Sequence, residues 1–174
     1  VGLMIIVRST RSLIKTITAF TVAHSITLGL ATLGYASVPA DPLNAAIALS
    51  ILFLGVEVVR LWRGQTSFTL RHPWIVAFAF GLLHGFGFAS GLTTVGLPSS
   101  DIPLALLAFN IGVEIGQLAF IACLVGVNMA GRSVLTRFSP WSVPKQGRVD
   151  AAAAHVLGIA ASFWFFQRLA GFAA

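Results

Sequence analysis

The stretch WIVAFAFGLLHGFGFASGLTTV, residues 74–95, carries no charged side chain and one histidine, His84. As an α-helix it would be about 33 Å long, close to the hydrocarbon thickness of a bilayer. Small residues at Gly81, Gly85 and Ala89 recur every four positions around the histidine, a spacing that lets a neighbouring helix approach closely. The stretch therefore predicts a membrane-crossing helix with one face packed against another helix.

The rest of the chain has the same apolar character. Of its 174 residues, 57% are hydrophobic and 9% are charged, whereas a soluble domain carries about a quarter charged residues. Further segments that are long and apolar enough to cross a bilayer are Ile14–Tyr35, Leu43–Trp62, Pro103–Val127 and Ala151–Phe172. We therefore predict an all-α protein, a polytopic transmembrane bundle of five full helices.

The whole chain, residues 1–174, is expected to form a single transmembrane domain. Its expected parts are a first helix pair at 14–62, a second helix pair at 74–127 and a last helix at 151–172. The apolar residues Val1–Val7 would span only about 10 Å as a helix. Residues 1–13 are therefore expected to hold the stub of a truncated sixth helix, followed by a cytoplasmic loop.

The net charge of +6 comes from basic residues that lie almost entirely between the apolar segments. Basic loops alternate with loops that carry Asp41 or Asp101 and no Lys or Arg. This alternation predicts that the basic loops are cytoplasmic and that the C-terminus lies outside. The same placement indicates that the chain's partner is an anionic lipid bilayer, and it argues against a nucleic acid as a partner.

Two pairs of segments share short patterns, which indicates an internal tandem repeat. The matches are Ala19-Phe20-x-x-x-His24 with Ala79-Phe80-x-x-x-His84, and Gly55-Val56-Glu57-Val58 with Gly112-Val113-Glu114-Ile115. Corresponding segments would cross the membrane in the same direction, so the repeat is predicted to be parallel. Parallel repeats are common in transporters, whose sites lie near the midplane between the repeats.

Polar side chains inside the predicted spans are the candidates for a site: His24, Glu57, His84, Asn110, Glu114 and Gln117. An ionisable residue at this depth costs at least about 2.5–3.5 kcal/mol, so it is retained mainly for pairing or for function. His24, His84 and Glu114 all come near the centre of the bilayer, and the amides of Asn110 and Gln117 share a helix face with Glu114. We predict a midplane site formed by two imidazoles and a carboxylate.

Imidazole and carboxylate groups suit divalent metals such as Ni²⁺, Co²⁺ and Zn²⁺, and they would serve equally as a proton relay. Glu57 precedes Arg60 by three residues, so a helical ion pair explains it as well as a role as a metal ligand does. Asn110 and Gln117 are explained equally by hydrogen bonds between helices. No HExxH, CxxC, P-loop or GxSxG pattern is present, and the sequence gives no case for an enzyme.

Taken in order, these motifs resemble the HupE/UreJ family of bacterial membrane proteins. The stretches that carry the resemblance are Thr18–Leu28, Ala48–Ile51 leading to Glu57, Phe80–Ala89 and Phe109–Gln117. The resemblance implies a nickel- or cobalt-handling permease of the bacterial cytoplasmic membrane. Ni²⁺ or Co²⁺ would then be the transported ion, and no permanently bound cofactor is expected.

The sequence supports two main hypotheses of function. In the first, the chain is a permease for a divalent transition metal, with His24, His84 and Glu114 as ligands. In the second, it is a non-transporting accessory or scaffold protein of a metalloenzyme maturation complex or another membrane complex, and its polar groups hold helices together. A proton-linked carrier of another solute is a third interpretation, and a homo-oligomer or an accessory complex stays open.

Overall fold

The computed structural model describes residues 6, 7, 9–94, 101–138 and 146–171, and their regular structure is entirely α-helical. The helices are α2 at Thr10–Thr32, α3 at Ala40–Trp62, α4 at Phe68–Arg71, α5 at Pro73–Thr94, α6 at Ile102–Phe138 and α7 at Gln146–Ala170. The predicted all-α class is therefore confirmed for the described residues, and each predicted apolar segment lies mainly on one long helix.

The helix ends differ from the predicted ones by up to five residues in most places and by eleven at the end of α6. α6 continues past the predicted end at Val127 as far as Phe138, and it thereby takes in part of the segment expected to be a basic loop. The first proline after this span is Pro140, so no proline interrupts the helix earlier. The short helix α4 was not predicted, and the hydroxyl of Ser67 caps it by accepting a hydrogen bond from the backbone N–H of Leu70.

Three of the described helices are long and apolar enough to cross a membrane. They are Thr10–Thr32, Ala40–Trp62 and the Ile102–Gly131 part of α6. The apolar part of α5 that is described, Pro73–Ala89, is shorter than a full span, and α7 is not among the spans found in the described residues. A count of five spans thus stays a prediction, whereas the membrane character of the chain rests on three helices.

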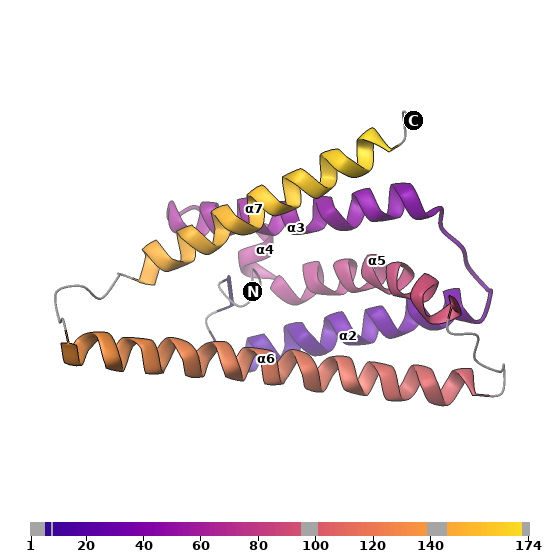
Figure 1. Ribbon diagram of the computed structural model, residues 1–174, viewed down its shortest axis with the longest axis horizontal. Helices are drawn as coiled ribbons and strands as arrows, with labels where there is room; N and C mark the ends of the chain where they lie inside the picture. The colour runs from indigo at the N-terminus through magenta and orange to yellow at the C-terminus, as the bar shows by residue number, and fades with distance from the viewer. Residues whose placement is uncertain (1–5, 8, 95–100, 139–145, 172–174) are drawn as a thin grey trace.

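The long helices run roughly along the long axis of the molecule, with α3 and α7 on one side and α6 on the other (Figure 1). The most extensive contact joins α2 to α5, and α7 packs along α3. Smaller contacts join α6 to α2 and α3 to α5. If α2 corresponds to α5 and α3 to α6, these last two contacts are equivalent, which is the arrangement that the predicted tandem repeat would produce.

The central pair of helices is in contact at the level of the backbone. A methyl group added at Gly81 of α5 would lie 2.9 Å from Cβ of Ala23 and closer still to the carbonyl oxygen of Phe20. One added at Gly85 would overlap the hydroxyl of Thr27. Gly81 and Gly85 therefore admit a neighbouring helix as predicted, and the neighbour is α2.

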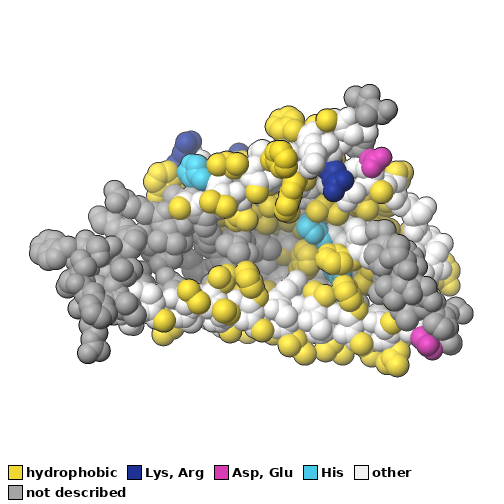
Figure 2. All heavy atoms as spheres, in the orientation of Figure 1, with side chains coloured by type: hydrophobic (Ala, Val, Ile, Leu, Met, Phe, Trp, Pro, Cys, Tyr) yellow, Lys and Arg dark blue, Asp and Glu magenta, His cyan; other side chains and the backbone are white. Residues whose placement is uncertain are grey.

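The surface that remains carries large apolar side chains. On α6 they include Leu104, Leu107, Ile111 and Ile115, each of which is more than half exposed. Hydrophobic side chains line the lower edge of the molecule in the orientation of Figure 2, where α6 lies. An apolar surface of this kind is compatible with lipid and not with water.

The α2–α5 contact generates a test with a matched control. Gly85→Ala should destabilise the protein by about 1–3 kcal/mol, because the added methyl group meets the backbone and hydroxyl atoms of α2. Gly116→Ala on α6 adds the same methyl group where nothing lies within 4 Å, so it should leave stability unchanged or higher. The measurement is the thermal unfolding midpoint of each purified variant in detergent, and equal midpoints would contradict the packing described above.

Candidate functional site

His24 of α2 is a buried imidazole without hydrogen bonds. The residue is 1% exposed, and neither ring nitrogen has a hydrogen-bond partner among the described residues. Aromatic rings from three helices surround it, with centroids 6.0 Å away for Phe20, 5.3 Å for Phe88 and 6.3 Å for Phe109. Buried polar groups are almost always hydrogen-bonded, so this imidazole among phenyl rings is a candidate for a functional site.

His84 of α5 also lies near the ring of Phe20, and it has one polar partner. Its ring centroid is 5.7 Å from that of Phe20 in an edge-on arrangement, and its Nε2 is 3.0 Å from the hydroxyl oxygen of Ser50 on α3. Phe20 thus contacts both imidazoles. Ser50 was not predicted as a site residue, although a serine in the middle of an apolar span is the signal that could have identified it.

Glu114 of α6 lies at a different level. Its carboxylate accepts a hydrogen bond of 3.0 Å from the hydroxyl of Thr18 on α2. Thr18 precedes His24 by six residues, which is about 9 Å along a helix axis. Within the part of the chain that the structure describes, no group of three or more His, Cys, Asp or Glu side chains could hold a metal ion. Both imidazoles lie against Phe20, whereas Glu114 bonds to Thr18, so a shared ligand set stays a prediction.

The two amides of α6 make no described contact that joins helices. Asn110 donates from Nδ2 to the carbonyl oxygen of Leu106 in its own helix at 2.8 Å. Its Oδ1 is buried and has no hydrogen-bond partner among the described residues. Gln117 is half-buried two turns further along α6. Asn110 therefore retains one polar atom for a ligand, and the roles of both amides as metal ligands stay predictions.

Glu57 has the ion pair that the sequence offered as one of its two interpretations. Its carboxylate is 2.8 Å from Nη1 of Arg60, and it also accepts a hydrogen bond from the hydroxyl of Ser67. The Glu57 residue is 1% exposed. Because Ser67 also caps α4, Glu57 ties the end of α3 to the start of α4. This geometry favours a structural role for Glu57 over a role as a ligand.

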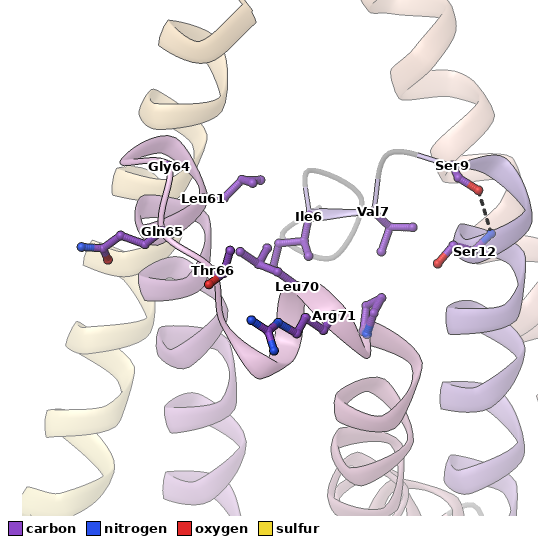
Figure 3. A pocket seen from close by; sticks show the side chains of 11 residues that line it. Ile6, Val7, Ser9, Ser12, Leu61, Gly64, Gln65, Thr66, Leu70 and Arg71 are labelled. Atoms are coloured by element: carbon purple, nitrogen blue, oxygen red, sulfur yellow. Dashed lines mark hydrogen bonds between the residues drawn. The ribbon is translucent and has the colours of Figure 1, made fainter.

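A cavity of about 570 Å³ lies where α2 begins and α3 ends. Ile6 and Val7 lie between these two helix ends, and Ser9 accepts the hydrogen bond that caps α2 (Figure 3). The lining residues come from the start of α2, the end of α3, the segment around α4 and the first residue of α5. Neither imidazole lines this cavity, so it is separate from the candidate site.

The sequence model of the family described as HupE / UreJ protein matches residues 1–168. The chain belongs to the HupE/UreJ family. Searches of curated proteins and of solved structures found no match. The predicted family is thereby confirmed over nearly the whole chain. This HupE/UreJ protein, in which three of the described helices are able to span a bilayer, is a membrane protein.

The Glu57 junction in this HupE/UreJ protein generates a second test. Arg60→Ala should destabilise the protein by about 1–3 kcal/mol, because it leaves a buried carboxylate with only a hydroxyl partner. Adding Glu57→Gln should restore part of the loss, since the amide carries no charge. The measurement is the unfolding midpoint in detergent, with Arg63→Ala as the control for loss of an exposed cation near the same helix end. A loss as large for Arg63→Ala would show that the Arg60–Glu57 pair is not the cause.

Proposed function

We propose that this HupE/UreJ protein is a permease for a divalent transition metal, Ni²⁺ or Co²⁺, in the bacterial cytoplasmic membrane. The observation that carries the proposal is His24, whose two ring nitrogens are buried without a hydrogen-bond partner among the described residues. A neutral imidazole is a good ligand for these metals. A phenyl cage offers a metal ion no competing ligand, so the imidazole is the polar group that the ion would meet there.

The position of the imidazoles supports this proposal. His24, His84 and Ser50 lie near the middle of α2, α5 and α3, respectively. α2 and α5 are the central pair of the bundle and correspond to each other in the predicted repeat. Transporter sites commonly lie at such repeat interfaces near the midplane. A metal ion that reaches this level would be enclosed by helices and separated from lipid.

We propose that the ion passes two successive stations instead of resting in one complete cage. The first is the imidazole level, and the second is the carboxylate of Glu114 beside Thr18, about 9 Å along α2. Asn110 and Gln117 lie on α6 on either side of Glu114 and would supply amide oxygens. Conduction requires sites that bind weakly enough to release the ion, so incomplete ligand sets suit a permease better than a cage.

The distribution of charge supports the predicted orientation in the membrane, in which the basic loops are cytoplasmic. The start of α2, the end of α3 and the start of α5 lie at one end of the bundle, since all three line the same cavity. Arg60, Arg63 and Arg71 belong to this end, and the ammonium group of Lys15 lies 4.1 Å from the centre of the Trp74 ring there. An excess of basic residues favours the cytoplasmic side, and tryptophan is common at either membrane interface. Glu114 would then be the station nearer the cytoplasm.

A non-transporting accessory role is the second candidate, and one observation favours it. Only 6% of the apolar stretch of α6 is buried inside the protein, whereas 39% is buried in the apolar stretches of α2 and of α3. A helix so little covered by its own chain could be covered by a partner in a membrane complex as well as by lipid. Transport measurements separate this role from that of a permease.

Nickel uptake tests the imidazole level. Cells that express the protein should accumulate radioactive Ni²⁺ or Co²⁺, and His24→Phe should reduce the initial rate at least about tenfold, because it removes the ring nitrogens but preserves the aromatic packing. His84→Phe should have a similar effect. His72→Ala changes a histidine outside the bundle centre and serves as the control, with uptake unchanged.

Expression in the membrane must be equal for all variants. Uptake that persists in the double variant His24→Phe, His84→Phe would contradict the site. No uptake of any divalent metal by the unaltered protein, together with its copurification in a larger complex, would instead support the accessory role.

The second station generates a separate expectation. Glu114→Gln preserves a side chain that can still bond to Thr18 but removes the negative charge. We expect it to lower the uptake rate several-fold and to leave Zn²⁺ binding to the purified protein, followed by calorimetry, nearly unchanged, because the imidazoles are intact. If Glu114→Gln abolished binding as completely as His24→Phe, one shared site would replace two stations.

A further inference from the structure

The hydroxyl of Ser50 has a single hydrogen, and a hydrogen bond within α3 already uses it. A serine hydroxyl has one hydrogen to donate and lone pairs to accept with. Ser50 Oγ lies 2.7 Å from the carbonyl oxygen of Ile47, which can only accept, so the single hydrogen is used in that bond. Ser50 Oγ is also 3.0 Å from Nε2 of His84. In this second contact the serine oxygen must accept, and Nε2 must carry the hydrogen.

The opposite arrangement is unfavourable for a physical reason. If the serine donated to Nε2, its oxygen and the carbonyl oxygen of Ile47 would face each other 2.7 Å apart with no hydrogen between them. Ser50 is 5% exposed, so little solvent is available to relieve the repulsion. The two distances together therefore select one proton arrangement, which runs from His84 through Ser50 to the backbone of α3.

We propose that Ser50 is a positioning residue that fixes the neutral His84 ring as the Nε2–H tautomer and leaves the lone pair on Nδ1 to bind the metal ion. Only an imidazole nitrogen without hydrogen can bind a metal, and a hydrogen bond from the other nitrogen sets which one that is. The metal in this statement rests on the proposed function, whereas the tautomer does not. The edge-on contact with Phe20 holds the ring in place.

The two imidazoles therefore differ in whether a hydrogen bond selects their tautomer. His24 has no described hydrogen-bond partner, so nothing selects its tautomer. With the repeat offset of 57 residues, the position that corresponds to Ser50 is Leu107, which carries no hydroxyl. His84 is therefore the oriented ligand of the pair, and His24 can present either nitrogen to a passing ion.

Nitrogen NMR of the full chain tests the tautomer directly. The protein is labelled with nitrogen-15 histidine, reconstituted without metal, and recorded at alkaline pH, where imidazole is neutral. The His84 signals are identified by their loss in His84→Phe. We expect the Nε2–H tautomer at His84, and a mixture of tautomers in Ser50→Ala. An Nδ1–H ring in the unaltered protein, or the same pure tautomer in Ser50→Ala, would overturn the proposal.

Zn²⁺ alone, which is diamagnetic, then probes which nitrogen binds. We expect the Nδ1 signal of His84 to respond, an affinity about tenfold lower for Ser50→Ala, and recovery in Ser50→Thr, which restores the hydroxyl. Binding through Nε2 would overturn the proposal but would leave metal transport standing. The expected tautomer with no response of either histidine to Zn²⁺ would remove the metal site and leave the role of Ser50 in the tautomer intact. If Ser50→Ala fails to fold, the measurements on the unaltered protein and on Ser50→Thr decide the matter.

Discussion

Gly81 and Gly85 allow the backbone of α5 to lie directly against α2, and the candidate site depends on this close approach. The two glycines flank His84, and they meet α2 on either side of the turn that carries His24. A side chain at either glycine would force the helices apart and would separate the two imidazoles. In a bilayer, where apolar residues gain little from meeting each other, such close packing is a main force that joins helices. The site therefore arises from the same contact that holds the bundle together.

Two buried ionisable residues show how differently the fold treats polar groups. Glu57 and His24 are equally buried, yet Glu57 has the Arg60 guanidinium and the Ser67 hydroxyl as partners, whereas the ring nitrogens of His24 have no hydrogen-bond partner among the described residues. A satisfied carboxylate at a helix junction stabilises that junction. An imidazole without partners lowers stability, and this cost makes His24 a candidate for binding a ligand through its nitrogens. This contrast is the reason that the proposed function uses His24 and assigns Glu57 a structural role.

Ser50 breaks the symmetry that the repeat would otherwise impose. α2 with α6 and α5 with α3 are equivalent contacts in the predicted repeat, but Ser50 contacts His84 in one and an apolar residue replaces it in the other. Glu57 and Glu114 likewise correspond in sequence and have different partners, an arginine and a serine for one and Thr18 for the other. Corresponding positions in a tandem repeat therefore take different roles, so the motif match alone does not assign function.

The sequence by itself determined the helical class, the approximate helices, the family and the candidate polar residues, because apolar runs and short motifs are properties of a single segment. It also offered the correct pair for Glu57, since Arg60 lies one turn away on the same helix. The tertiary structure alone decided that Ser50 meets His84 and that Thr18 meets Glu114, contacts that join residues 34 and 96 positions apart. Helical periodicity fixes which residues share a face, but the rotation and axial offset of one helix against another come from packing, which no single segment encodes.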